Sequence, residues 1–370
     1  MKVLYTNFHK SENINGHVTY VRLLVEGLSD RCGFFVASPG GSALNRAVES
    51  VDGVNIFNVD YSARVYKMIP SLIKIRKLVV KNGIDIVHVN GSSDHRIVAI
   101  AIMFLKNKPK VVLTKHNSKP IRYISGLIKR IIGMDGVIAV CSSSERMVRE
   151  SVYKSLKILK IENGVDTDFF SPSGEKWSVE GWREKQGLVG KIVIGSNAGT
   201  SRYKGWINML RALAALGVEE RARFHVAVAG GEIGLEEMEE IKVLGLESQF
   251  TYAGMLSDVR DFVRSIDIGF VLSYEVETIS FACREMMSCG KPVIVTNYAG
   301  LPDNVNENEN GWIVPVGDVE AISKILLSIA NNEVDVNEMG GKAREKAVKG
   351  FGMENFVLET EGFYKRVLKG

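Results

Sequence analysis

The sequence predicts two doubly wound α/β domains, each built on a parallel sheet with helices between its strands. Three observations point to this fold class. The chain has 370 residues, which is too long for one ordinary domain and comfortable for two. Strand and helix patterns alternate along the first half, and the alternation restarts near Lys191. Most of the strands are continuous apolar runs, as a parallel sheet buried on both faces requires.

The elements of the first half follow in order. Helices are predicted from apolar residues at helical spacing, and Gly83 ends the second of them. They cover 17–30 and 66–83, and the strands are predicted within 1–7, 32–41, 84–91, 109–117 and 135–143. In the second half, strands are predicted within 191–197, 223–232, 249–254, 266–274 and 291–297. We expect two domains, 1–165 and 166–351, joined near the polar, aromatic stretch 162–182.

Charge is spread unevenly over these domains. Residues 1–165 carry 25 Lys and Arg against 12 Asp and Glu, a net charge of +13, and residues 166–370 carry a net charge of −9. Such asymmetry suggests that the first domain faces an anionic partner: nucleic acid, a membrane surface or a phosphate-bearing substrate. The longest apolar run, Ile97 to Leu105, is shorter than the roughly 18 residues that span a bilayer.

Other sequence features favour a cytoplasmic protein. The N-terminus lacks the apolar run of a signal peptide. The four cysteines form no CxxC pair and are typical of reduced, mostly buried residues.

Ligands of open α/β sheets bind at the carboxyl ends of the strands, so the residues just after each strand are the candidates for function. After strand 191–197 comes a small polar turn, then Arg202 and Lys204, and then the start of a helix. Two cations beside a helix N-terminus can neutralise a diphosphate without a metal. The alternative is a solvated basic loop without a ligand.

Two glutamates follow strand 266–274. Glu277 lies in the hydroxyl-rich stretch "ETIS", and Glu285 lies about two turns into the helix that this stretch opens. Thr278 and Ser280 are residues typical of a helix N-cap. The N-terminus of this helix could hold a leaving diphosphate, and Glu285 could accept hydrogen bonds from sugar hydroxyls. The alternative for Glu285 is an exposed helical residue near Arg284.

These segments together resemble one enzyme family. Glu277-x7-Glu285 with "MMSCGKPVIVT", "AGLPDNV" and "NGWIVPVGD" resembles the nucleotide-sugar signature of retaining GT-B glycosyltransferases of family 4, the glycosyl transferases group 1. "INGHVTYVRLLVEGL", "VVLTKHN", "IENGVDTDFFSP" and "KGWINMLRAL" follow in the family's order. The resemblance covers nearly the whole chain. It implies two Rossmann-like domains facing across a cleft, with a C-terminal helix at about 352–370 packed back on the first domain.

The resemblance also implies a role for each matching residue. His116 and Glu277 would be catalytic, beside the transferred sugar. The donor, a nucleoside diphosphate sugar with a UDP-sugar favoured, would be bound by Gly16, Arg202, Lys204, Thr278, Ile279, Ser280 and Glu285, with neither metal nor cofactor. Two departures stand out: Asn15-Gly16 replaces the frequent double glycine of the first loop, and "GSN", ending at Asn197, replaces a frequent arginine.

Other functions remain as alternatives. A glycosidase would use two carboxylates at about 5 to 9.5 Å but has no use for a phosphate turn. A non-hydrolysing nucleotide-sugar epimerase with a GT-B-like fold is the nearest enzymatic rival. A non-enzymatic protein could bind an anionic surface or nucleic acid through its basic half, although no nucleic-acid recognition motif is present. Asp166 and Asp168 could be read as a metal pair, which their interdomain position argues against.

The acceptor is expected to be a glycan of the bacterial cell envelope, such as lipopolysaccharide, either free or lipid-linked. A helix is predicted within Lys119–Ile132, where isoleucines at helical spacing alternate with Arg122, Lys129 and Arg130. It could simply pack on the sheet with its basic residues in solvent. It could instead contact an anionic membrane surface, because basic amphipathic helices combine apolar burial with electrostatic attraction. The protein would then be peripheral on the inner face of the plasma membrane.

Overall fold

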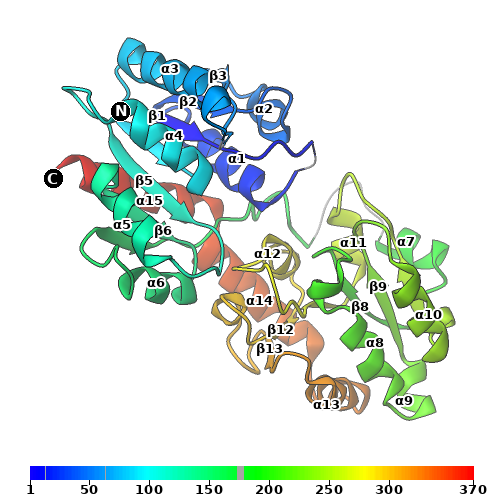
Figure 1. Ribbon diagram of the computed structural model, residues 1–370. Coiled ribbons are helices and arrows are strands. Elements are labelled where there is room, and N and C mark those ends of the chain that lie inside the picture. The colour runs from blue at the N-terminus through cyan, green and yellow to red at the C-terminus, as the bar shows by residue number, and fades with distance from the viewer. Residues whose placement is uncertain (13, 63, 173–178) are drawn as a thin grey trace. The chain divides into compact units, whose positions relative to one another are not determined.

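The structure is a computed structural model that describes residues 1–12, 14–62, 64–172 and 179–370. The chain forms two compact units (Figure 1). The first unit contains Met1–Gly164 and Met353–Gly370, and the second contains Val165–Gly352. Each unit holds one parallel sheet with helices packed on it, so the predicted α/β fold class is confirmed.

The first unit has a seven-stranded sheet in the order β3-β2-β1-β4-β5-β6-β7, with every neighbouring pair parallel. Strand order reverses between β1 and β4, which pair from Val3 with Ile86 to Thr6 with Val89. This is the switch point at which ligands of such sheets bind. The strands are β1 (Lys2–Thr6), β2 (Gly33–Ser38), β3 (Val54–Asn58), β4 (Ile86–Val89), β5 (Lys110–Lys115), β6 (Gly136–Ala139) and β7 (Lys157–Lys160).

The helices of the first unit include one from the far end of the chain. They are α1 (Gly16–Leu28), α2 (Ala43–Val48), α3 (Val65–Asn82), α4 (Ser92–Ile102), α5 (Tyr123–Gly133), α6 (Ser142–Arg149) and α15 (Met353–Leu368). Helix α15 packs on α1 and next to β5, and its Tyr364 hydroxyl lies 2.6 Å from the Tyr5 hydroxyl and 2.5 Å from Nδ1 of His88. Buried hydrogen bonds therefore tie the last helix into the sheet of the first unit.

The second unit has a six-stranded parallel sheet in the order β10-β9-β8-β11-β12-β13, with its switch point between β8 and β11. The strands are β8 (Ile192–Ser196), β9 (Phe224–Val228), β10 (Phe250–Tyr252), β11 (Ile268–Val271), β12 (Val293–Thr296) and β13 (Gly311–Val314). The helices are α7 (Val179–Lys185), η1 (Arg202–Lys204), α8 (Ile207–Ala214), α9 (Val218–Ala222), α10 (Leu235–Val243), η2 (Glu247–Gln249), α11 (Arg260–Ser265), α12 (Phe281–Ser288), η3 (Leu301–Asn304), α13 (Val319–Ala330) and α14 (Val336–Phe351).

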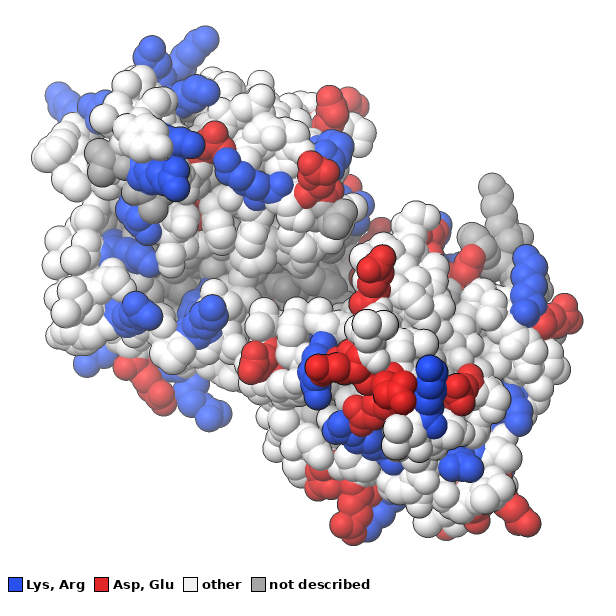
Figure 2. All heavy atoms as spheres, turned by 45° about the vertical axis from the view of Figure 1, so that its right-hand side comes forward, with Lys and Arg blue, Asp and Glu red and all other residues white. Residues whose placement is uncertain are grey.

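The two units differ in charge as their sequences imply. The first unit contains 28 Lys and Arg against 15 Asp and Glu, and the second contains 19 against 28. In the view of Figure 2, Lys and Arg side chains spread over the first unit, and acidic side chains gather on the second. Throughout the described residues, each helix falls short of the length and apolarity needed to cross a bilayer.

Candidate functional site

The second unit brings two predicted residues together at its switch point. Lys204 ends η1, the short turn after β8, and Glu277 follows β11. Nζ of Lys204 lies 2.8 Å from Oε2 of Glu277, and the two side chains are only 16% and 10% exposed. At such low exposure an ion pair is weakly screened by water and its geometry is well defined. A cation and a carboxylate are thus held in contact at the edge where a ligand would bind.

The backbone holds the Lys204 turn against the Glu277 loop. Gly205 has φ +69°, and a Cβ there would lie 2.1 Å from the carbonyl oxygen of Leu272 at the end of β11. Only glycine allows this approach. The amide of Tyr274 also donates a hydrogen bond to the carbonyl oxygen of Tyr203, with a distance of 3.0 Å. These two contacts fix Lys204 relative to the residues that follow β11.

The stretch from Glu277 to Ser280 precedes α12 rather than opening it, because the helix begins at Phe281. Ser280 is the N-cap, as its residue type predicts, and its side chain accepts a hydrogen bond from the amide of Cys283. Its φ of +58° is unusual for a residue with a side chain. The amide of Thr278 donates to Oε1 of Glu277 at 3.2 Å, and the side chain of Ile279 is buried. Glu277 therefore already occupies one of the amides predicted to bind phosphate.

Glu285 lies within α12 and is half-buried, next to Asn197 at the end of β8. The amide nitrogen of Asn197 donates to Oε2 of Glu285 at 2.6 Å. The amide oxygen Oδ1 of Asn197 is buried and has no hydrogen-bond partner among the described residues. Because a buried polar atom without a partner costs free energy, this oxygen is a place for a ligand hydroxyl. Asn197 was not among the predicted site residues; its position at a strand end was the available signal.

Arg202 lies in the same turn as Lys204 but has a different partner. Its side chain is 60% exposed and forms an ion pair with Glu236 on α10, with 2.5 Å between Nη1 and Oε2. The hydrogen bond to Glu236 raises the pKa of Arg202, which stays charged. In this structure, Arg202 is therefore directed to a surface carboxylate and does not join the Lys204–Glu277 pair.

The first unit places the other two predicted residues at its own switch point. Gly16 is the first residue of α1, where the side chain of Asn15 accepts hydrogen bonds from the amides of His17 and Val18. His116 follows β5, and its Nε2 lies 2.9 Å from Oδ1 of Asn90. Both residues stand at carboxyl ends of strands or at the helix start that follows one, as expected for ligand-binding positions.

Three histidine rings form a row at this edge. The ring of His17 lies 4.3 Å from that of His116 and 4.5 Å from that of His9. Burial, with a smaller contribution from His9, lowers the pKa of His17 to about 4, and burial holds the pKa of His116 well below its ordinary value. The row is therefore neutral at physiological pH. No sequence pattern links His9 and His17 to His116.

His88 lies inside β4, below this row. Both of its ring nitrogens are hydrogen-bonded, Nδ1 to the Tyr364 hydroxyl and Nε2 to the Thr114 hydroxyl, which lies at 2.6 Å. Tyr20 also bonds to Thr114, at 2.9 Å. With both ring nitrogens bonded inside the sheet, His88 has a structural role.

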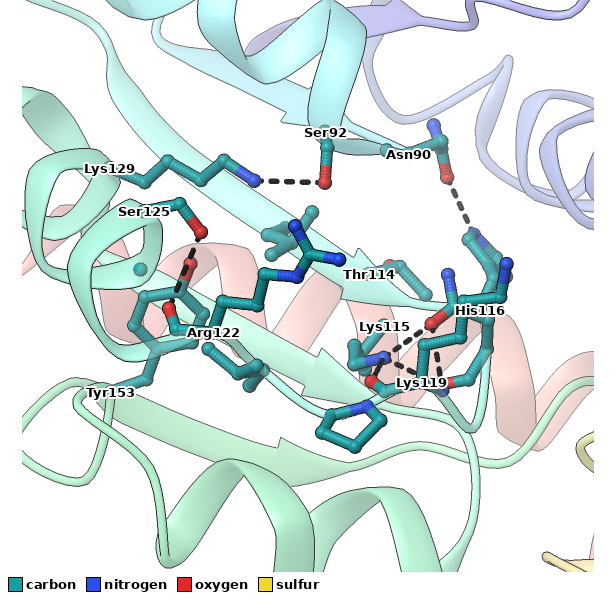
Figure 3. A pocket seen from close by; sticks show the side chains of 16 residues that line it. Asn90, Ser92, Thr114, Lys115, His116, Lys119, Arg122, Ser125, Lys129 and Tyr153 are labelled. Atoms are coloured by element: carbon teal, nitrogen blue, oxygen red, sulfur yellow. Dashed lines mark hydrogen bonds between the residues drawn. The ribbon is translucent and has the colours of Figure 1, made fainter.

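A pocket of about 310 Å³ opens beside His116 (Figure 3). It lies between the N-terminus of α4 and the segment that leads into α5. We call it the basic pocket because Lys115, Lys119, Arg122 and Lys129 line it. Figure 3 shows the Arg122 guanidinium pointing into the space between Ser92 and Thr114.

The structure corrects one expectation for α5. Its isoleucines were expected to pack on the sheet in the simpler of the two interpretations, but Ile124, Ile128 and Ile131 point to solvent, with Ile124 and Ile131 exposed to 75% and 73%. Gly126 is the buried residue of this helix. The spacing of these three residues places them on one helical face, which we call the isoleucine ridge. An amphipathic pattern can thus point either way, and here the isoleucine ridge faces out while Leu127 and Ile132 are half-buried.

No group of three or more metal-ligating side chains occurs in the described parts of the chain. Asp166, one of the two acids considered as a metal pair, instead accepts hydrogen bonds from the amides of Asp168 and Phe169, at 3.1 and 2.9 Å. This arrangement is a local turn cap.

Two family models match the chain. Residues 178–346 match the model described as glycosyl transferases group 1, and residues 14–169 match the model described as Glycosyltransferase Family 4. Two relatives match over most of their length at 25% identity. One is the N-acetyl-alpha-D-glucosaminyl L-malate synthase of Bacillus anthracis, with 80% of this chain and 78% of the relative covered. The other is the UDP-Gal:alpha-D-GlcNAc-diphosphoundecaprenol alpha-1,3-galactosyltransferase of Escherichia coli, with 85% and 84% covered.

Solved structures share the whole fold. A glycosyltransferase from Rickettsia africae ESF-5 superposes with a TM-score of 0.86 at 21% identity, covering 100% of this chain and 99% of the other. Anabaena Alr3699/HepE in complex with UDP superposes with a TM-score of 0.84 at 18% identity, covering 99% and 100%. At these identities the likeness concerns the fold, which is that of GT-B glycosyltransferases with two Rossmann-like domains.

Proposed function

Because the chain belongs to the group 1 glycosyltransferases, and is therefore a glycosyl-transferring enzyme, we propose that it is a retaining transferase that uses a nucleoside diphosphate sugar. The sugar would pass to a hydroxyl group of an acceptor. The epimerase and the non-enzymatic alternatives lose their support, since both family models describe glycosyltransferases.

The observation that carries this proposal is the Lys204–Glu277 ion pair at the switch point of the second unit. A departing diphosphate develops negative charge, which preorganised cations and amides stabilise in a site shielded from water. Lys204 would turn from Glu277 to the diphosphate when the donor binds. Glu277 would then be released to accept hydrogen bonds from the sugar, as its family match implies. The amides of Thr278, Ile279 and Ser280 would complete the phosphate site.

The remaining donor contacts follow from the same edge of the sheet. Glu285 would accept hydrogen bonds from the ribose hydroxyls, with Asn197 beside it as an additional ligand-binding residue. Arg202 would serve the diphosphate only after leaving Glu236. We favour a UDP-sugar because the Escherichia coli relative is named for a UDP-Gal donor and the Anabaena neighbour was solved with UDP.

In the first unit, Gly16 would let the first turn of α1 approach the donor phosphates, and neutral His116 would contact the transferred sugar. We propose that the acceptor attacks from the face that the diphosphate leaves, which retains the configuration of the sugar. The acceptor would be a glycan of the bacterial cell envelope, with a lipid-linked one favoured because the Escherichia coli relative is named for a diphosphoundecaprenol acceptor.

A membrane contact through α5 would bring the enzyme to such an acceptor. The isoleucine ridge offers apolar side chains, and Arg122, Lys129 and Arg130 lie on the same segment. Such helices lie in the bilayer interface without spanning it, and each Lys or Arg near an anionic surface contributes about 1 kcal/mol. The proposed location is cytoplasmic and peripheral, on the inner face of the plasma membrane.

We propose that transfer needs no metal, because Lys204 and backbone amides would take over charge stabilisation. Activity should therefore be unchanged in excess EDTA. A strict requirement for a divalent ion would contradict this part of the proposal.

The decisive experiment is a panel of nucleoside diphosphate sugars scored for nucleoside diphosphate release, with a membrane extract as acceptor source. One donor should be used well above the others, and proton NMR of the product should show the anomeric configuration of the donor. Release from no donor would contradict the proposed activity, and an inverted product would contradict the retaining mechanism.

A further inference from the structure

We infer that the basic pocket of the first unit binds a phosphoryl group of the acceptor, so that the acceptor is a phosphate or diphosphate ester. This inference rests on the proposed function, and it assigns the acceptor's chemical class and the residues that recognise it.

The first argument is the charge of the pocket wall. Four of its lining residues are Lys or Arg, and none is Asp or Glu. Nζ of Lys129 donates to the Ser92 hydroxyl at 2.8 Å. Within the described ranges, Lys119 and Arg122 form hydrogen bonds only through their backbone atoms, and the Arg122 guanidinium and the Lys119 ammonium have no hydrogen bond or ion pair.

Lys115 also contacts only neutral groups. Its ammonium donates to the carbonyl oxygens of Asn117 and Lys119 and to Oδ1 of Asn117, at 2.5 to 2.7 Å. Burial lowers the pKa of Lys115 to about 8, because a cation there loses water without gaining a counter-charge. An anion in the pocket would remove this cost. Asp94, a buried residue in the first turn of α4, does not line the pocket, and its Oδ2 accepts from the Thr6 hydroxyl and from the amide of Asn90.

The second argument is the set of donors around the pocket. Gly91 caps α4 without a side-chain hydrogen bond, and the Ser92 hydroxyl and the Lys129 ammonium lie at this helix N-terminus. Opposite them, Arg122 offers a planar fork of N–H groups that matches phosphate oxygens. Cations on both sides of a cavity of about 310 Å³ fit a diphosphate better than a single carboxylate, because a diphosphate can reach both sides.

The third argument is the position of the pocket. His116, predicted to stand beside the transferred sugar, lines the same cavity. A phosphoryl group bound by Arg122 and Lys129 would therefore hold the rest of the acceptor close to His116. The isoleucine ridge of α5 begins at Ile124, two residues after Arg122, which is the N-cap of this helix. A lipid-linked phosphate and a soluble phosphate ester would share the phosphoryl chemistry. Only the lipid-linked one has a tail that could contact the isoleucine ridge.

The test is calorimetric titration of the full chain with inorganic diphosphate while UDP saturates the donor site. The pocket variant is Arg122→Gln with Lys129→Gln. The control variant is Lys106→Gln with Lys108→Gln, which removes the same charge from exposed residues of the loop that precedes β5. We expect saturable binding to the wild type and the control, and at least 10-fold weaker binding to the pocket variant. Thermal unfolding of both variants confirms that they fold.

Equal binding to the two variants, or no saturable binding to the wild type, would overturn the inference. Tighter binding of L-malate, a dicarboxylate without a phosphoryl group, than of diphosphate would overturn it as well. Titration with farnesyl diphosphate distinguishes a lipid-linked acceptor from a soluble one. An affinity at least 10-fold above that of inorganic diphosphate assigns a lipid diphosphate, and an equal affinity assigns a soluble phosphate ester. UDP affinity is measured separately in each variant and should be unchanged. If the wild type did not bind UDP, the proposed donor would be contradicted, whatever the result for the basic pocket.

Discussion

The cations at the two switch points have different partners. In the second unit, Lys204 is paired with Glu277, whereas in the first unit Arg122 and Lys129 contact no carboxylate. An anionic ligand of the second unit must therefore compete with the Glu277 carboxylate for Lys204. An anionic ligand of the first unit would bring the first negative charge to Arg122 and Lys129. This difference suits a donor whose diphosphate must leave after reaction and an acceptor anion that serves as an anchor.

The largest expected effect tests the paired side of this comparison. Lys204→Ala should lower the turnover number for transfer by on the order of 100-fold or more, because the departing diphosphate loses its buried cation. The matched control is Lys324→Ala, which breaks an exposed ion pair with Glu320 on α13 and should leave the rate unchanged. Steady-state kinetics with the preferred donor measure both. A wild-type rate in Lys204→Ala would contradict the phosphate role of this residue.

The isoleucine ridge provides the next test, on the unpaired side. Ile124→Gln with Ile131→Gln should weaken binding to vesicles of anionic lipid by about 10-fold or more, since burial of one such side chain contributes about 1.5–3 kcal/mol. Co-sedimentation with anionic and neutral vesicles is the measurement.

Helix α3 is the alternative membrane contact, because it also exposes isoleucines, Ile69 and Ile73, among basic residues. The variant Ile69→Gln with Ile73→Gln should bind vesicles as the wild type does. If only the α3 variant loses binding, the membrane contact lies on α3, and the role of α5 is wrong.

Asn197 gives a smaller effect in the second unit. Asn197→Ala should weaken UDP binding by about 10-fold, or about 1.4 kcal/mol, because it leaves Glu285 without its amide donor. Asn197→Asp should weaken it further, since it sets a second carboxylate beside Glu285. Calorimetry with UDP measures both. Unchanged affinity in both variants would remove Asn197 from the donor site.

We expect the first unit to lose more folding stability than the second as pH falls. Five of the six histidines lie in the first unit, and all four tryptophans lie in the second. Burial lowers the pKa of His88 to about 3 and those of His17 and His95 to about 4. Such groups bind protons more readily in the unfolded chain, so each costs on the order of 1 kcal/mol of stability per pH unit as pH falls from about 6.5 towards 4.

Two further groups with shifted pKa values enter this comparison. Burial raises the pKa of Asp94 to about 7, so its effect has the opposite sign and offsets about one histidine in the first unit. His225, the histidine of the second unit, has its pKa lowered to about 4 by burial. The first unit should therefore unfold first as pH falls below 6. Circular dichroism at 222 nm would change before tryptophan fluorescence does, and coincident transitions would contradict this order.

The sequence predicts the centres of both sheets better than their edges. Central strands such as β4 and β11 are continuous apolar runs because helices or neighbouring strands bury both faces. The edge strands β3 and β7 were not predicted, since they are partly exposed and carry mixed residues. Edge strand β13 is mostly buried but was not predicted either.

For the candidate sites, strand ends identified the residues but not their partners. The Lys204–Glu277 contact depends on the close approach of Gly205 to Leu272, which no local pattern encodes. The row formed by His9, His17 and His116 likewise joins the loop after β1, the start of α1 and the end of β5. The direction of α5 was left open for a related reason: periodicity shows that a helix has an apolar face and does not show what covers it.

The discontinuous first unit has a consequence for synthesis on the ribosome. Its seven strands emerge early, but α15 is translated only after the whole second unit. Until then, His88 and Tyr5 lack the Tyr364 hydroxyl, and Tyr20 lacks its ring contact with Phe356. Domains generally complete folding as units during translation, N-terminal first. In this chain the continuous second unit can complete its fold first, so the nascent first unit must wait, with buried polar groups still unpaired, for a helix encoded about 190 codons after its last strand.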